Sequence, residues 1–244
     1  MNKFNHVISL GFFCSVALEI DKLGLREASY PFDWLISDFQ GIIECMENDF
    51  CDFLNYSNLK QYTNNGRYYY DSKYKFHFYH DFSKYVPLRK QITLVKEKYN
   101  RRITRFKNNI KEPTLFIRYI ENKTELKYIE NNYEYIIKLL KSFNNYNDLL
   151  LISNDDIISS NSLKIYKVVK DNNDTVARNF LMKNLYLKEY LLSDIYDLNH
   201  RNNNYKNYQN TEKKKKLVKY LKKIKNTYNK LFKKEYIHNK QINL

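Results

Sequence analysis

Short apolar runs alternate along this chain with longer stretches of helical periodicity. The runs are VISL at 7–10, TLFIRYI at 114–120, LLLIS at 149–153 and LKIYKVV at 163–169. Between and after them, apolar residues recur at helical spacing over 88–110, over 124–143 and from 174 to about 197. Strands that alternate with helices favour a sheet with helices packed on it. The pattern predicts an α/β fold with a central, mostly parallel sheet flanked by helices.

The C-terminal part differs in composition from the rest. Residues 212–244 hold 12 Lys and 2 Glu, and so carry +10 of the net charge of +15. The preceding stretch, NHRNNNYKNYQNTE, has the low hydrophobicity of a linker. We therefore expect an α/β domain at 1–198, a linker at 199–212 and a basic amphipathic helix at 213–244.

The basic tail suggests a partner with negative charge. Its apolar residues fall on one helical face among lysines, which suits a helix that lies on an anionic membrane surface through residues 213–235. Nucleic acid and docking on the domain itself are the alternatives. Lysine without arginine offers no base readout, so any nucleic-acid binding should be nonspecific.

Cysteine usage indicates the compartment. The three cysteines form an odd set without a Cys-x-x-Cys pair, and nothing in the sequence has the spacing of a zinc site. We expect no metal and no cofactor. A reducing environment fits such thiols, and the N-terminus lacks the pattern of a signal peptide. The expected location is the cytoplasm, with the tail able to hold the protein at the inner face of the membrane.

Cys14 is the candidate nucleophile. The run VISL is followed by Gly11, which permits a sharp turn, and by a helical pattern that ends at Gly24. Cys14 therefore falls at or near the first turn of a helix, where free N–H groups and the helix dipole favour a thiolate and lower the thiol pKa. The alternative is a small buried side chain without chemistry, as expected for Cys45 and Cys51 in the next helical pattern.

Two sequence pieces resemble a known family. The first comprises S-L-G-x-x-C-x-x-A-L and G-L-R-x-x-S-x-P-F-D-W, from Ser9 to Trp34, and the second is His80-Asp81-Phe82. They resemble the DUF1796 family of papain-like cysteine peptidases. The resemblance implies a peptidase with Cys14 as nucleophile, and it favours His80 as the imidazole that pairs with it.

The run KFHFYHDF offers two histidines to act with Cys14. It alternates like a strand, with His80 at the strand end and His77 inside it, and the residues alone make the two nearly equal candidates. Imidazole would accept the thiol proton. Asp33, Asp81 or Asp155 would orient the ring. For Asp33, a local cap or a salt bridge to Arg26 is the alternative.

Polar residues at the ends of apolar runs form the expected substrate-binding set. Arg118 interrupts TLFIRYI, and either binds an anionic group of the substrate or forms a structural ion pair, with Glu121 following closely. Trp34, Asn154 and Asp155 complete the set. Parallel strands would bring Gly11–Cys14, His80-Asp81, Arg118 and Asn154-Asp155 to one edge of the sheet, where ligands of α/β sheets bind.

Two classes of function follow. The first is a cysteine-dependent hydrolase or acyl transferase whose substrate has a carbonyl or acyl group, with a transferase in surface-polysaccharide synthesis as a further option. The second is a non-catalytic binding or scaffold domain in which the cysteine is buried.

Overall fold

The computed structural model describes residues 4–61, 69–83, 85–154, 157, 163–169 and 179–193. By internal contacts the chain divides into residues 1–196 and 197–244. The described residues all belong to the first unit. Asp155, the expected linker at 199–212 and the expected tail at 213–244 lie outside them.

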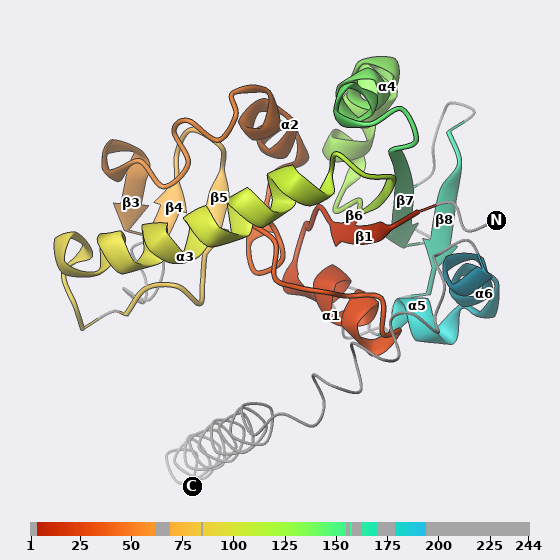
Figure 1. Ribbon diagram of the computed structural model, residues 1–244, viewed down its shortest axis with the longest axis horizontal. Helices are drawn as coiled ribbons and strands as arrows, with labels where there is room; N and C mark the ends of the chain where they lie inside the picture. The colour runs from red at the N-terminus through yellow and green to blue at the C-terminus, as the bar shows by residue number, and fades with distance from the viewer. Residues whose placement is uncertain are drawn as a thin grey trace, which may run out of the picture. The chain divides into compact units, whose positions relative to one another are not determined.

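A four-stranded parallel sheet confirms the predicted fold class (Figure 1). Its order is β1 (His6–Ser9), β6 (Thr114–Tyr119), β7 (Asp148–Asn154) and β8 (Ile165–Val168), and each neighbouring pair is parallel. All six residues of β6 are buried. Strands covered on both faces are apolar without alternation, which is why these runs were recognisable in the sequence.

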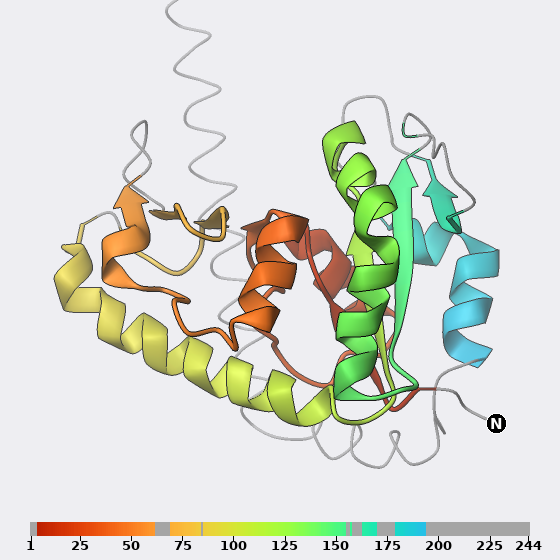
Figure 2. The same ribbon diagram turned by 90° about the horizontal axis from the view of Figure 1, so that it is seen from above.

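Helices cover both faces of the parallel sheet. Figure 2 shows α4 (Lys123–Phe143) on one side of β7 and α5 (Phe180–Lys183) with α6 (Leu185–Ser193) on the other. The α4 side packs with Phe116 and Leu151, whereas α1 (Cys14–Lys22), α5 and α6 pack with Ile117 and Leu150. At the end of α1, Gly24 has a φ of +73° and stands at the left-handed position that the sequence predicts.

A second sheet is antiparallel, with the order β2 (Ile36–Ser37), β5 (Phe76–Phe78), β4 (Tyr69–Asp71) and β3 (Leu59–Gln61). Helix α2 (Phe39–Glu47) and a short 3-10 helix (Tyr56–Asn58) lie between β2 and β3 in the chain. One face of this sheet packs into an aromatic core with the long helix α3 (Leu88–Asn109), where the rings of Phe78 and Tyr99 lie 5.7 Å apart.

This second sheet corrects one expectation. His80-Asp81 follow β5 of the antiparallel sheet, so they do not share the carboxyl edge of the parallel strands with Gly11 and Asn154. The expectation that all these strand ends meet at one edge is therefore wrong.

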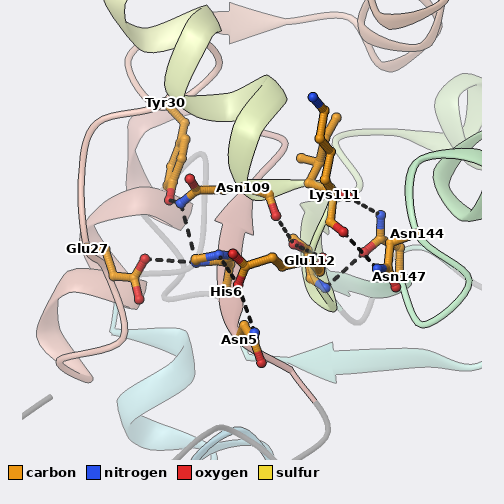
Figure 3. A network of polar contacts seen from close by, with 11 residues as sticks. Asn5, His6, Glu27, Tyr30, Asn109, Lys111, Glu112, Asn144 and Asn147 are labelled. Carbon is orange, nitrogen blue, oxygen red and sulfur yellow. Dashed lines mark hydrogen bonds and ion pairs between the residues drawn. The ribbon is translucent and has the colours of Figure 1, made fainter. Parts of the chain in front are cut away.

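A polar network fixes the opposite, amino-terminal edge of the parallel sheet (Figure 3). His6 Nδ1 lies 2.8 Å from a carboxylate oxygen of Glu27, and His6 Nε2 lies 3.4 Å from one of Glu112. Asn109 at the end of α3 donates to the hydroxyl of Tyr30 at 2.8 Å. His6 begins β1, whereas Cys14 follows its end, so this network stands apart from the candidate nucleophile.

Within the described residues, no helix combines the length and apolar character needed to cross a membrane.

Candidate active site around Cys14

A pinned turn presents Cys14 after β1. Gly11 has a φ of +82°, and its carbonyl accepts the N–H of Tyr119 at 3.3 Å. The next carbonyl, of Phe12, accepts the N–H of Ser37 at 2.9 Å. The turn is thus held by β6 of one sheet and β2 of the other. Cys14 is the first residue of α1, at the helix start that the sequence predicts.

The thiol of Cys14 is partly buried, and its pKa shifts in the direction opposite to the expectation. Burial raises its pKa, and the opposing effect of a hydrogen bond from its own backbone N–H is smaller. The predicted lowering of the Cys14 pKa is therefore wrong, and the thiol keeps its proton at neutral pH. Phe13, the N-cap residue, provides no side-chain cap for the first-turn N–H groups.

His77 is the middle residue of β5, so its side chain lies on the face of the antiparallel sheet opposite to Phe76 and Phe78. It is the cross-strand partner of Ile36, and paired residues place their side chains on the same face. Ile36 packs against the apolar cluster that contains Phe12 and Val16, which lie two residues before and two residues after Cys14. The ring of Tyr70 covers His77 at 4.7 Å between centroids. Burial lowers the pKa of His77, so its imidazole is neutral at pH 7 and can accept a proton.

His80 and Asp81 have other surroundings. His80 is exposed on the bend after β5. The side chain of Asp81 is only 3% exposed and turns toward α3, where it forms an ion pair with Lys98 and accepts a hydrogen bond from the Tyr99 hydroxyl at 2.9 Å. Both oxygens of Asp81 are thus bound to α3 side chains.

Asp33 forms the salt bridge to Arg26 that the sequence left open as an alternative. Its carboxylate accepts from Arg26 Nη2 at 2.7 Å and from the backbone N–H of Tyr30 at 2.9 Å. Burial raises the pKa of Asp33, while the charge and hydrogen bond of Arg26 oppose the shift. The Arg26 guanidinium lies 5.2 Å from the ring centre of Trp34, so Trp34 lies beside this ion pair.

Arg118 is fully buried and joins three parts of the fold. Its Nε donates to Glu125 of α4 at 2.6 Å. Nη1 donates to the carbonyl of Leu10 at 2.8 Å, and Nη2 to the carbonyl of Ser37 at 2.8 Å. The ring of Phe39 lies 5.1 Å below the guanidinium. Arg118 therefore forms the structural ion pair considered from the sequence, and ties β1, β2 and α4 together behind the Cys14 turn.

Asn154 ends β7 at the carboxyl edge of the parallel sheet. It is 9% exposed, and its Oδ1 has no hydrogen-bond partner among the described residues. Over the same described residues, no group of three or more His, Cys, Asp or Glu side chains could hold a metal ion.

The part of the chain that contains this site is similar to known proteins. The family model described as "Putative papain-like cysteine peptidase (DUF1796)" matches residues 5–153, which include β1, the Cys14 turn, the antiparallel sheet and β6. The chain belongs to this family. It is also 43% identical over 54 residues to an uncharacterized protein of Acanthamoeba polyphaga mimivirus. That match covers 22% of this chain and 24% of the viral protein, so the chain spans about a quarter of that relative. No solved structure matches the chain significantly.

Sequence reasoning missed two residues of this DUF1796 site. Ser37 accepts from both terminal nitrogens of Arg118, yet a two-residue strand gives no periodic signal. Glu125, rather than Glu121, is the carboxylate that pairs with Arg118. Its signal was present, because Asn122-x-x-Glu125 has the spacing of a helix capping box, and Asn122 Oδ1 accepts the Glu125 N–H at 3.0 Å.

Proposed function

We propose that the protein is a cysteine-dependent hydrolase in which Cys14 is the nucleophile and His77 the general base. The observation that supports this most is the place of Cys14 as first residue of α1, with His77 on the sheet face of Ile36, which packs against the apolar cluster that includes Phe12 and Val16. The family description, a papain-like cysteine peptidase, agrees with this chemistry.

The protonation states define the mechanism. Cys14 carries a neutral thiol and His77 a neutral imidazole, so no thiolate–imidazolium pair is formed in advance. As the sulfur attacks the substrate carbonyl carbon, the thiol proton passes to His77. N–H groups at the start of α1 stabilise the negative charge on the carbonyl oxygen.

The second half of the reaction returns the proton. The imidazolium protonates the leaving group, and the C–S bond of a thioester on Cys14 remains. Water then attacks the thioester carbon while His77 accepts a water proton, and the thiol recovers its proton as the acid product leaves. An acceptor alcohol or amine in place of water would make the same enzyme an acyl transferase.

His80 with Asp81 is the competing arrangement. The sequence resemblance favours it, but His80 is exposed and Asp81 is bound to α3 side chains. Asp33 is likewise bound to Arg26. We therefore assign His80 no proton transfer and treat the two aspartates as structural.

Acyl trapping tests the nucleophile. The full-length protein is treated with p-nitrophenyl acetate, quenched in acid, and mapped by peptide mass spectrometry. We expect one acetyl group on Cys14 at early times and none in Cys14→Ala. Cys51 is exposed, contrary to its expected packing role, and is the internal control for nonspecific acylation. Acetylation of Cys51 without Cys14, or of neither, would refute the proposal and favour the scaffold class.

A further inference from the structure

The loop before β2 docks on α3 through arginines. Arg105 of α3 donates to the carbonyl of Ser29 at 2.7 Å. From the loop, Arg26 Nη2 donates to the hydroxyl of Ser29 at 2.9 Å and to Asp33 at 2.7 Å. Two guanidinium groups thus meet at Ser29, one from each side of the contact.

Arg102 adds a third cation at this contact. It precedes Arg105 by three residues, so the two side chains lie on the same face of α3. Its guanidinium lies 4.9 Å from the ring centre of Tyr99, which donates to Asp81. The charge of Arg102 also opposes the rise that burial causes in the pKa of Asp33, as expected of a cation close to that carboxylate.

Positive charge exceeds negative charge here. Asp81 is paired with Lys98, and Asp33 with Arg26. Arg102 has no carboxylate within ion-pair distance in the part of the chain that the structure describes. The contact therefore retains a positive charge that a negatively charged ligand would neutralise.

Two charged N–H groups at this contact are buried without acceptors. Nε of Arg26 and Nη1 of Arg102 have no hydrogen-bond partner among the residues described. A buried donor of a charged group is costly to leave unpaired, and proteins usually satisfy it with a ligand or water. Arginine is the side chain best suited to carboxylate and phosphate, because its planar N–H groups match their oxygens.

We propose that Arg26 and Arg102 form a binding site for an oxyanion, a carboxylate or a phosphate, next to Trp34. Nε of Arg26 and Nη1 of Arg102 are the donors, and the Arg26–Asp33 bond holds the first guanidinium in place through Nη2, which leaves Nε free for the ligand. The site does not depend on Cys14 chemistry, so it can be tested whether or not the protein is a hydrolase.

The chain offers a built-in reporter for this site. Trp34 is the single tryptophan in the sequence, and it lies under the Arg26 guanidinium. The full-length protein is titrated with sodium phosphate and, separately, with sodium acetate, while chloride keeps the ionic strength constant. Fluorescence is excited at a wavelength selective for tryptophan. We expect a saturable change with at least one of the two anions, and the stronger binder identifies the ligand class.

Matched variants locate the binding. Arg102→Met should weaken anion binding about tenfold or more, because a hydrogen bond to a charged group contributes roughly one to two decades in affinity. Arg26→Lys keeps the charge beside Asp33 but removes Nε, and should weaken binding similarly. Arg101→Met, which changes the exposed neighbouring arginine on α3, should leave binding unchanged.

Three results would overturn the proposal. The first is no saturable change with either anion, which means that water satisfies the two donors. The second is equal weakening by Arg101→Met and Arg102→Met, which means general attraction to basic α3. The third is unchanged binding in Arg26→Lys. If Arg102→Met does not fold by circular dichroism, Arg102→Lys replaces it with the same expected loss.

Discussion

Replacement of Arg118 by methionine should destabilise the protein strongly. Arg118 is 0% exposed, and its partner Glu125 has a side chain only 8% exposed. Methionine would leave the Glu125 carboxylate buried without its cation. It would also remove the donors to the carbonyls of Leu10 and Ser37. Breaking a buried ion pair on one side costs about 3–5 kcal/mol in the free energy of unfolding.

The expected loss is large on the scale of a domain. For a domain of this size each kcal/mol corresponds to roughly 2–4 °C in Tm, so Arg118→Met should lower Tm by about 6–20 °C. The assay is urea unfolding followed by circular dichroism, with the midpoint and slope fitted for each variant. Arg101→Met, at an exposed position of α3, is the control and should change stability by less than about 0.5 kcal/mol.

A double variant separates the lost ion pair from the lost packing. Arg118→Met with Glu125→Leu removes the uncompensated carboxylate, and should recover part of the stability lost in Arg118→Met alone. A loss below about 1 kcal/mol in the single variant would refute the tethering role of Arg118. The tethering role would also be refuted if the double variant lost more free energy of unfolding than the sum of the losses in the two single variants.

Two further predictions concern the Cys14 turn. Gly11→Ala and Gly24→Ala each place a side chain at positive φ, which costs about 1–2 kcal/mol. A Cβ at Gly11 would also lie 2.3 Å from the hydroxyl oxygen of Ser37, whereas one at Gly24 meets nothing within 4 Å. Gly11→Ala should therefore lose about 1–3 kcal/mol more in urea unfolding, and equal losses would contradict this. The second prediction concerns the rate at which iodoacetamide labels Cys14, measured against pH. This rate should rise with a midpoint above the ordinary thiol pKa of ~8.5, because burial raises the pKa of Cys14. A midpoint near neutral pH would contradict the general-base mechanism.

The sequence predicts the parallel sheet well because its strands are buried on both faces. β6 and β7 have six and seven residues, nearly all buried, and their centres are the apolar runs LFI and LLLI. The helix after β1 was equally clear, since its apolar spacing ends at Gly24, a residue suited to the left-handed position. In both cases the local pattern and the final packing agree.

The antiparallel sheet and the site electrostatics could not be predicted in the same way. β2 has two residues and β5 three, so neither contains enough alternation to reveal its partner. Their pairing brings residue 36 beside residue 77, which is far away in the sequence. His77 belongs to this pairing, whereas His80 lies outside it. The pKa of Cys14 depends on how deeply the surrounding fold buries it, which outweighs the local effect of the helix start.

Transient kinetics of Cys14 acylation test the central claim most directly. The p-nitrophenol burst is measured at pH 7 in the wild type, His77→Ala and His80→Ala, and acetyl-Cys14 is confirmed by mass spectrometry. General-base catalysis contributes typically 10²–10⁴-fold, so His77→Ala should slow the burst by roughly that factor, while His80→Ala should stay within about twofold of the wild type. A burst that His80→Ala abolishes and His77→Ala preserves would contradict the assignment, and would move the catalytic imidazole to the bend after β5.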